Sequence, residues 1–242
     1  MAAALKTLKK ELRQRIKLVL SELSSETVAN QTSHAVKTLL LSPEYQAAKR
    51  ISVYLSMPAG EISTTGIVHD ALSQGKKVFI PYTYKLSSPK TGQPKSIMDM
   101  LELHSLKDFE SLKPDSWGIP TPSEDSLSGR ENSFGGKGVT QGEMGDCGEV
   151  EAGLDLIVMP GMAFDSEFGR LGHGKGFYDY FLERCHQHSS QDTMAKMPFL
   201  VGLALKEQLL PGTESVPMDT TDWHLNALIV GDGRLFRSKS ST

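Results

Sequence analysis

Apolar residues in the first part of the chain recur at helical spacing. In residues 5–23, leucine and isoleucine return every three or four positions with lysine and arginine between them, which predicts an amphipathic helix. Residues 24–26, Ser-Ser-Glu, are typical of a helix start and predict a second helix to about Leu41. Ser42-Pro43 then either ends that helix or begins a short third one.

The pattern then changes to alternating strands and helices. Residues 50–55 alternate polar and apolar side chains and predict a strand, residues 64–73 predict a helix, and residues 76–81 predict the next strand. This strand–helix–strand order is typical of a parallel βαβ unit. The remaining predicted elements are strands at 97–103, 154–160, 199–204 and 227–230 and a helix at 178–186.

These elements together predict an α/β fold of three layers, a single domain in which a mostly parallel central sheet is flanked by helices. Such sheets bind ligands at the carboxyl ends of their strands. Residues 85–96 are polar and predict a surface loop. Residues 123–150 are rich in Gly, Ser and Glu with almost no large apolar residue, so we expect a flexible insertion whose removal leaves stability nearly unchanged.

Composition narrows the class of protein. The 242 residues are 38% apolar and 23% charged, as in globular domains, and a net charge of −3 argues against a general nucleic-acid binder. No apolar run approaches the length of a membrane span. Cys147 and Cys185 lack the context of a disulfide framework, and the N-terminus lacks the apolar core of a signal peptide. We therefore expect a cytoplasmic protein; Glu11 and Glu22 argue against a mitochondrial transit peptide.

A Gly-rich, basic segment carries most of the functional argument. The four glycines within residues 169–176 allow backbone N–H groups to turn toward an anion. Arg170, His173 and Lys175 add charged or titratable donors, and the helix predicted next points its N-terminus at the same place. The segment matches neither the Walker loop nor the dinucleotide fingerprint. It predicts a phosphate site, with a solvated tight turn as the alternative, and Asp179 could bind Mg²⁺ there.

Residues 154–179 also resemble the signature of a known family, the 5-formyltetrahydrofolate cyclo-ligases or methenyltetrahydrofolate synthetases. The matching runs are Asp155-Leu156-Ile157-Val158-Met159-Pro160-Gly161, Phe164-Asp165, Gly169-Arg170-Leu171-Gly172 and Gly176-Phe177-Tyr178-Asp179. Supporting matches lie at residues 9–13, 54–62, 116–122 and 206–208. The resemblance covers nearly the whole chain apart from 85–96 and 123–150.

The resemblance implies an ATP- and Mg²⁺-dependent enzyme. Its reaction would convert 5-formyltetrahydrofolate, alone or polyglutamylated, to 5,10-methenyltetrahydrofolate with release of ADP and phosphate. The implied route passes through a phosphorylated formyl group, an iminium phosphate. We expect a monomer with no nucleic-acid or membrane partner.

The resemblance also implies site residues. Its ATP site would consist of Lys9, Arg13, Arg170, Leu171, Gly172, His173, Gly174, Lys175, Gly176, Phe177 and Tyr178. Its folate site would consist of Arg13, Leu55, Glu61, His173, Gly174, Lys175, Gly176 and Phe177. The expected catalytic residues are Lys175, Arg170 and Tyr178, and the expected Mg²⁺ ligands are Asp179 and Asn226.

Several assignments have alternatives. Lys9 could lie on a solvated helix face and Glu61 in a surface loop. Asn226 stands where the family has an aspartate and brings no charge to a metal, so Asp222 is the alternative ligand. Phe177 lacks a hydroxyl that the family often has, and His173 would make phosphate binding depend on pH. For the whole chain, the alternatives are a kinase or sugar-phosphate enzyme and a non-catalytic folate- or nucleotide-binding protein.

Overall fold

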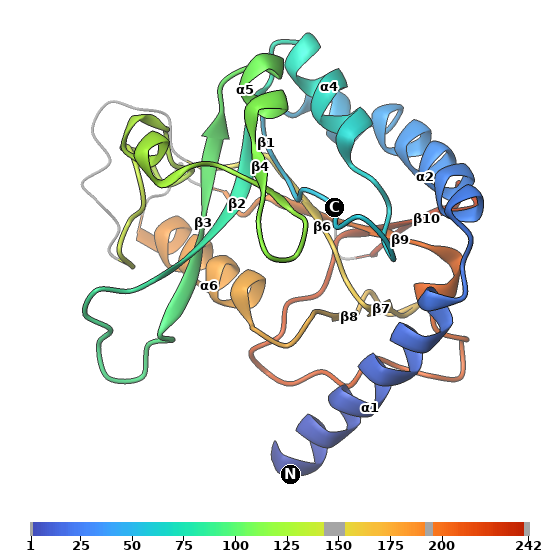
Figure 1. Cartoon of the computed structure of the whole chain (residues 1–242). Coiled ribbons are helices and arrows are strands. Elements are labelled where there is room, and N and C mark those ends of the chain that lie inside the picture. Colours follow the sequence, from blue (N-terminus) through green and yellow to red (C-terminus); the bar gives the residue numbers. More distant parts are fainter. Residues whose placement is uncertain (1, 143–152, 192–195, 240–242) are drawn as a thin grey trace.

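The computed structural model describes residues 2–142, 153–191 and 196–239 and has a seven-stranded central sheet with helices on both faces (Figure 1). The strand order is β11-β10-β9-β6-β1-β2-β3. In chain order these strands are β1 (Arg50–Val53), β2 (Lys77–Lys85), β3 (Ser96–Leu103), β6 (Leu156–Met159), β9 (Phe199–Ala204), β10 (Ala227–Val230) and β11 (Leu235–Arg237). Strands β10, β9, β6, β1 and β2 run parallel, whereas the edge strands β3 and β11 are antiparallel to their neighbours.

The helices divide between the two faces of the sheet. The α-helices are α1 (Ala2–Ser21), α2 (Ser25–Leu40), α3 (Pro43–Ala47), α4 (Thr65–Ser73), α5 (Leu106–Ser111) and α6 (Phe177–Gln191). Helices α1, α2 and α4 cover one hydrophobic core and α6 covers the other. Successive side chains of β6 alternate between the cores, since Leu156 and Val158 face the first and Ile157 and Met159 the second. The predicted three-layer, mostly parallel α/β fold is confirmed.

Smaller elements complete the chain. They are β4 (Lys113–Pro114), β5 (Pro120–Thr121), the 3₁₀ helices η1 (Glu124–Gly129) and η2 (Lys206–Gln208), β7 (Ala163–Phe164) and β8 (Arg170–Leu171). The last two form a short antiparallel ribbon that leads into the Gly-rich segment. Within the described residues, no helix is both long and apolar enough to cross a membrane.

The segment expected to be a flexible insertion is ordered over most of its length. Backbone groups of residues 131–133 pair with the outer edge of β3: Glu102 N–H donates to the Glu131 carbonyl at 2.8 Å, and Ser133 N–H donates to the Met100 carbonyl at 2.9 Å. Phe134 is 4% exposed. The expectation is therefore wrong for residues 123–142, because pairing with an open sheet edge orders a segment of low average hydrophobicity. Residues 143–150 lie outside the described part of the chain.

This correction can be tested by replacing Phe134 with leucine. The Phe134 ring lies 5.2 Å from the ring of Phe181 in α6 and 4.9 Å from the Arg184 guanidinium carbon. Losing the aromatic contacts and three buried carbon atoms should lower the free energy of unfolding by about 1–2 kcal/mol. Urea denaturation would measure the change. An unchanged midpoint would mean that this segment is as loosely held as its composition suggests.

The strand order creates a crevice between β1 and β6. From β1 the chain continues to β2 on one side, whereas from β6 it continues to β9 on the other. The loops that leave the carboxyl ends of these two strands therefore diverge, and such a switch point is where open α/β sheets bind ligands. Tyr54 directly after β1 and Pro160 directly after β6 both line a large cavity at this edge.

Candidate active site

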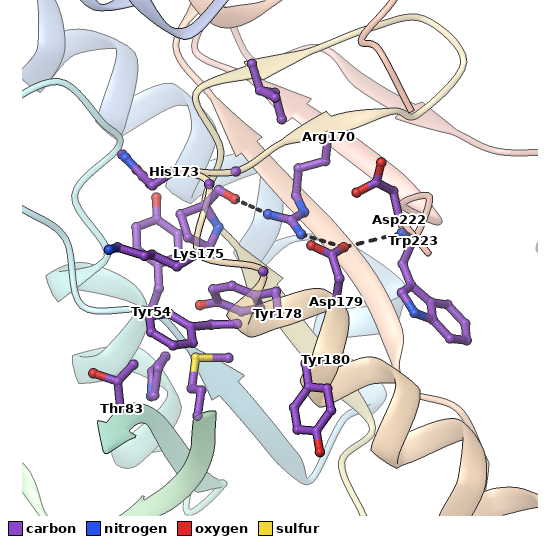
Figure 2. A pocket seen from close by; sticks show the side chains of 18 of the residues that line it. Tyr54, Thr83, Arg170, His173, Lys175, Tyr178, Asp179, Tyr180, Asp222 and Trp223 are labelled. Atoms are coloured by element: carbon purple, nitrogen blue, oxygen red, sulfur yellow. Dashed lines mark hydrogen bonds and ion pairs between the residues drawn. The ribbon is translucent and has the colours of Figure 1, made fainter. Parts of the chain in front are cut away.

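The cavity at the carboxyl edge of the sheet has a volume of about 1300 Å³ and gathers side chains from distant parts of the sequence (Figure 2). Helix α1, the loop after β1, the β2–β3 pair, the start of α6 and residues 219–224 all contribute. Pockets for a single small ligand usually measure about 300–1,000 Å³. The cavity therefore has room for two ligands at once.

One wall is the turn formed by residues 172–176. Gly174 and Gly176 have φ angles of +93° and +68°, a backbone conformation that side chains other than glycine rarely adopt. A Cβ at Gly174 would also lie 3.2 Å from the guanidinium carbon of Arg13. Helix α6 begins directly afterwards at Phe177. A glycine turn that leads directly into a helix N-terminus is an arrangement that suits an anion, and the phosphate site predicted here from the sequence stays a prediction.

Cationic side chains surround this turn. Arg13 Nε donates to the Gly172 carbonyl at 2.7 Å, which fixes α1 against the turn. Arg170 is buried, and its Nε has no hydrogen-bond partner among the described residues. Lys175 is exposed, and within the described part of the chain its ammonium has no ion-pair or hydrogen-bond partner. These groups leave donors available for a phosphate.

His173 belongs to the same turn but is expected to be neutral. Desolvation in the pocket, together with the charges of Arg13 and Arg170, lowers the pKa of His173. A phosphate bound beside the imidazole would favour its protonated form and oppose this effect. The affinity for a phosphate ligand would then depend on pH through His173, as the sequence predicted.

Carboxylates face these cations across the mouth of the pocket. Asp179 Oδ1 accepts from Arg170 Nη2 at 3.1 Å and from the Trp223 backbone N–H at 3.3 Å. Asp222 Oδ2 accepts from Lys9 Nζ at 2.5 Å, and Asp219 lies 3.2 Å from the same ammonium. Lys9 is therefore paired in this structure and would have to exchange a carboxylate for a phosphate.

The opposite wall contains a buried carboxyl group. Glu61 is 7% exposed and accepts a hydrogen bond from the Met57 backbone N–H. Burial raises the pKa of Glu61 from 4.5 to about 7, although the Met57 N–H lowers it. Near neutral pH the group can therefore exist in either protonation state. Leu55, from the same loop, lines the pocket beside it.

Tyr178 lies between the two walls, with its hydroxyl buried and without a hydrogen-bond partner among the described residues. The Arg170 guanidinium carbon lies 5.4 Å from the centre of its ring. Burial raises the pKa of Tyr178 well above 10, so the hydroxyl keeps its proton and can donate to a ligand.

The sequence assigned no roles to the aromatic end of the pocket. Tyr82, Met98 and Trp117 line it together with Tyr180 of α6. The four residues come from β2, β3, the loop between β4 and β5, and α6, so no local spacing could have grouped them. The signal that the sequence offered at one of these positions was the supporting family match at residues 116–122, which includes Trp117.

The family of the chain follows from a match along almost its entire length. Residues 5–231 match the model of the 5-formyltetrahydrofolate cyclo-ligase family. The chain belongs to the 5-formyltetrahydrofolate cyclo-ligase family. Membership confirms the resemblance of residues 154–179 and the enzyme class that it implied, an ATP-dependent ligase.

Individual cyclo-ligases are similar in sequence to this chain over nearly their full lengths. The 5-formyltetrahydrofolate cyclo-ligase of Mus musculus is 33% identical over 231 residues, which cover 96% of this chain and 97% of the mouse protein. The probable 5-formyltetrahydrofolate cyclo-ligase of Caenorhabditis elegans is 36% identical over 227 residues, 94% of each chain. The solved structure of 5,10-methenyltetrahydrofolate synthetase from Aquifex aeolicus superposes with a TM-score of 0.63, covering 97% of this chain and 95% of that chain at 23% identity. That likeness supports the shared fold.

The pocket brings together almost every site residue that the cyclo-ligase resemblance implied. Those that line it are Lys9, Arg13, Leu55, Glu61, Arg170, Leu171, Gly172, His173, Gly174, Lys175, Gly176, Phe177, Tyr178 and Asp179. The two alternatives of a solvated Lys9 and a surface Glu61 are both wrong, since one side chain is ion-paired and the other is buried. The roles of these residues stay predictions.

Asn226 is the exception and requires a correction. It precedes β10, at the amino end of the strand, whereas the cavity lies at the carboxyl ends. Its Oδ1 accepts from the Leu200 backbone N–H at 2.7 Å, so the amide completes the pairing of β9 with β10. The prediction that Asn226 is a metal ligand is contradicted, whereas the alternative ligand, Asp222, lines the pocket.

The donor set fits a magnesium ion that is held mainly by a bound nucleotide. Among the described residues, no group of three or more His, Cys, Asp or Glu side chains is placed to hold a metal alone. Mg²⁺ commonly uses one or two carboxylates and takes its other ligands from phosphate oxygens and water. Asp179 and Asp222 both line the pocket, and the backbone N–H of Trp223, the residue after Asp222, donates to Asp179, so the two carboxylates suit that arrangement (Figure 2).

Substitutions at the two candidates for the second Mg²⁺ ligand, Asp222 and Asn226, test whether Asp222 binds the metal. Asp222→Asn should raise the Mg²⁺ concentration for half-maximal activity several-fold, roughly 3- to 10-fold, because one charged ligand becomes neutral. Asn226→Asp, which adds a charge outside the pocket, should leave that concentration unchanged and serves as the matched control. Titrating Mn²⁺ by electron paramagnetic resonance in the presence of ADP would measure metal binding without turnover. Tighter metal binding by Asn226→Asp would restore the original assignment.

Proposed function

We propose that this protein converts 5-formyltetrahydrofolate to 5,10-methenyltetrahydrofolate, with ATP consumed and ADP and phosphate released. The observation that carries the proposal is the presence of two different recognition surfaces in one cavity. A phosphate-binding turn with Lys175 and Arg170 forms one wall, and the buried carboxyl of Glu61 lies in the other. Family membership supplies the substrate class.

The folate would bind with its pterin ring toward Glu61. The ring amino group and a ring N–H are donors, and an ionised carboxylate accepts such a pair through its two oxygens. Tyr82, Met98 and Trp117 would cover the flat aromatic parts of the ligand. The formyl group on N5 would then point toward the phosphate-binding turn.

ATP would bind with its phosphates at residues 172–176 and the N-terminus of α6. Arg13, Arg170 and Lys175 would neutralise charge on the transferred group, and Lys9 would join them after leaving Asp222. Bound Mg²⁺, held by Asp179 and Asp222, would supply further charge neutralisation at the phosphates.

The proposed chemistry activates a poor electrophile. The formyl oxygen attacks the γ-phosphorus of ATP and ADP leaves, which gives an iminium phosphate at N5. N10 then attacks the formyl carbon, loses its proton, and phosphate departs with the former formyl oxygen. Tyr178 offers its unpaired hydroxyl as a hydrogen-bond donor to the reacting oxygens. Most of the rate would come from positioning and electrostatic stabilisation.

A direct assay tests the proposal. Purified protein with 5-formyltetrahydrofolate, ATP and Mg²⁺ should develop the near-ultraviolet absorption of methenyltetrahydrofolate, with one phosphate released per product formed. Omitting ATP should abolish the change. Phosphate transfer to a substrate without ring closure would favour a kinase, and binding of both ligands without product would favour a non-catalytic protein. Dependence on Mg²⁺, use of polyglutamylated folate, the monomeric state and the cytoplasmic location stay predictions.

A further inference from the structure

A buried cluster of polar side chains stands at the outer edge of β3, next to the aromatic end of the pocket. Asp99 in β3 is fully buried and forms an ion pair of 2.8 Å with Arg184 of α6, which is 4% exposed. Tyr84 of β2 donates its hydroxyl to Asp99 Oδ2 at 2.8 Å. Thr140 donates its backbone N–H to the same oxygen at 2.6 Å, and its hydroxyl accepts from Arg184 Nη1 at 3.0 Å. We call these four residues the Asp99 cluster.

None of the four residues lines the pocket, but three residues of the neighbouring wall, Tyr82, Met98 and Tyr180, each contact one of them. The Tyr82 ring stacks on the Tyr84 ring with centroids 6.3 Å apart and an interplanar angle of 20°. The Met98 carbonyl accepts a hydrogen bond from Arg184 Nη2. The Arg184 guanidinium carbon also lies 5.7 Å from the centre of the Tyr180 ring.

We propose that the Asp99 cluster positions the pocket wall formed by Tyr82, Met98 and Tyr180 and thereby sets the affinity of the site for the folate rather than for ATP. The inference rests on the proposed function, because it assigns this wall to the folate. Among the described residues, none of the cluster's hydrogen bonds reaches Arg13 or the turn at 172–176, and Arg184 lies two turns along α6 from the helix N-terminus, so we expect ATP affinity to change less than folate affinity.

The cluster also gives a role to the segment that the sequence predicted to be a flexible insertion. Thr140 belongs to the segment that runs along the open edge of β3, and it closes the cluster from outside the sheet. An ion pair buried this deeply is costly unless further hydrogen bonds satisfy it. Tyr84 and Thr140 supply those bonds to Asp99, which holds the pair in one geometry.

A pair of matched tyrosine variants separates positioning from stability. Tyr84→Phe removes one hydroxyl that donates to a carboxylate and keeps the ring that stacks on Tyr82. Tyr45→Phe is the control, because the Tyr45 hydroxyl donates to Asp70 at 2.6 Å and this tyrosine does not line the pocket. Both variants should lower the melting temperature by similar amounts.

Only Tyr84→Phe should change folate binding. Calorimetric titration with 5-formyltetrahydrofolate should give a Kd raised about 3- to 10-fold, the effect of one hydrogen bond, with ADP affinity and kcat at saturation unchanged. Tyr45→Phe should bind both ligands as the parent does. Equal folate affinity in the two tyrosine variants would overturn the inference, as would a parallel loss of ADP affinity in Tyr84→Phe.

Thr140 provides a second, independent test. Thr140→Val removes the hydroxyl that bonds to Asp99 and Arg184, and it should raise the folate Kd by a similar factor. Thr140→Ser keeps that hydroxyl and should restore parental affinity. Identical behaviour of the valine and serine variants would contradict the proposal. A parent protein that binds no 5-formyltetrahydrofolate would overturn the proposed function together with this inference, whereas a binding parent with unaffected variants would overturn the inference alone.

Discussion

Replacing Lys175 with alanine is expected to weaken ATP binding roughly 10- to 150-fold without changing thermal stability. The ammonium is exposed in the phosphate-binding turn and has no partner in the described part of the protein, so its removal breaks no internal contact. A charge-assisted hydrogen bond to a phosphate oxygen is worth about 1.5–3 kcal/mol. Calorimetric titration with a non-hydrolysable ATP analogue would measure the loss.

Lys10→Ala is the matched control for this prediction. Lys10 is an exposed lysine of α1, close in sequence to Lys9, but it does not line the pocket. Its removal changes the net charge by the same amount and should leave nucleotide affinity nearly unchanged. Equal losses in the two variants would mean that Lys175 acts only through the overall charge and does not contact the phosphates.

Replacing Glu61 with glutamine is expected to stabilise the protein at alkaline pH and to weaken folate binding. Folding raises the pKa of Glu61 from 4.5 to about 7 because the carboxyl is buried. The folded state therefore binds the proton more tightly, and stability falls as pH rises between these two values. The penalty is on the order of 3 kcal/mol above pH 7, since a tenfold change in proton affinity corresponds to about 1.4 kcal/mol. Glutamine has the same shape and removes this penalty.

Two measurements check this prediction. The melting temperature of Glu61→Gln should match the parent near pH 4, below the ordinary pKa of the carboxyl, and exceed it near pH 8 by roughly 6–12 °C. Parental affinity for 5-formyltetrahydrofolate should increase between pH 6 and 8 as Glu61 ionises, whereas the variant should bind at least about tenfold more weakly with no such dependence. A variant that binds folate as tightly as the parent would falsify the role of Glu61.

Glu131 supplies a control, because its pKa is shifted in the opposite direction to that of Glu61. Burial raises its pKa, but hydrogen bonds from Lys77 and Arg50 outweigh this and lower the pKa below its ordinary value. Its ionised form therefore stabilises the fold, and that stability is lost as pH falls. Glu131→Gln should lower the melting temperature near pH 8, where Glu61→Gln raises it.

The sequence predicted best those elements whose signals are local. The strands at 199–204 and 227–230 were predicted with the bounds that the structure has, because each is a compact apolar run next to a residue that interrupts strands or is polar: Pro198 before the first, Asn226 and Gly231 around the second. The phosphate-binding turn was equally accessible, since its glycines, its basic residues and the start of the following helix all lie within residues 169–179. Strand β2 extends beyond its predicted end at 81 to Lys85 because β3 pairs with it along the hairpin, a partner that the local pattern does not reveal.

The errors arose where position depends on distant partners. Asn226 lies only four residues from Asp222, but the chain between them passes from the pocket to the amino end of β10. The family resemblance aligned Asn226 with a metal ligand by residue type alone. Residues 222–226 have no helical or strand periodicity, so the sequence could not show that the chain leaves the pocket between Asp222 and Asn226. The segment at 123–142 was misjudged because its order comes from an open strand edge and a few buried anchors such as Phe134. Tyr82, Met98 and Trp117 meet only after folding, so no sequence spacing could have grouped them.

Because Trp117 lies in this wall, the intrinsic tryptophan fluorescence of the protein can report ligand binding. The chain has only two tryptophans, Trp117 and Trp223, and both line the same cavity from different segments. Trp117 is 65% exposed, so its emission is that of an indole in water until a ligand covers it. Trp223 lies 5.8 Å from the ring of His186, beside the carboxylate end of the pocket. With one indole replaced by phenylalanine, the emission of the other reports occupancy of its own wall, and the order in which the two ligands enter can be followed in unlabelled protein.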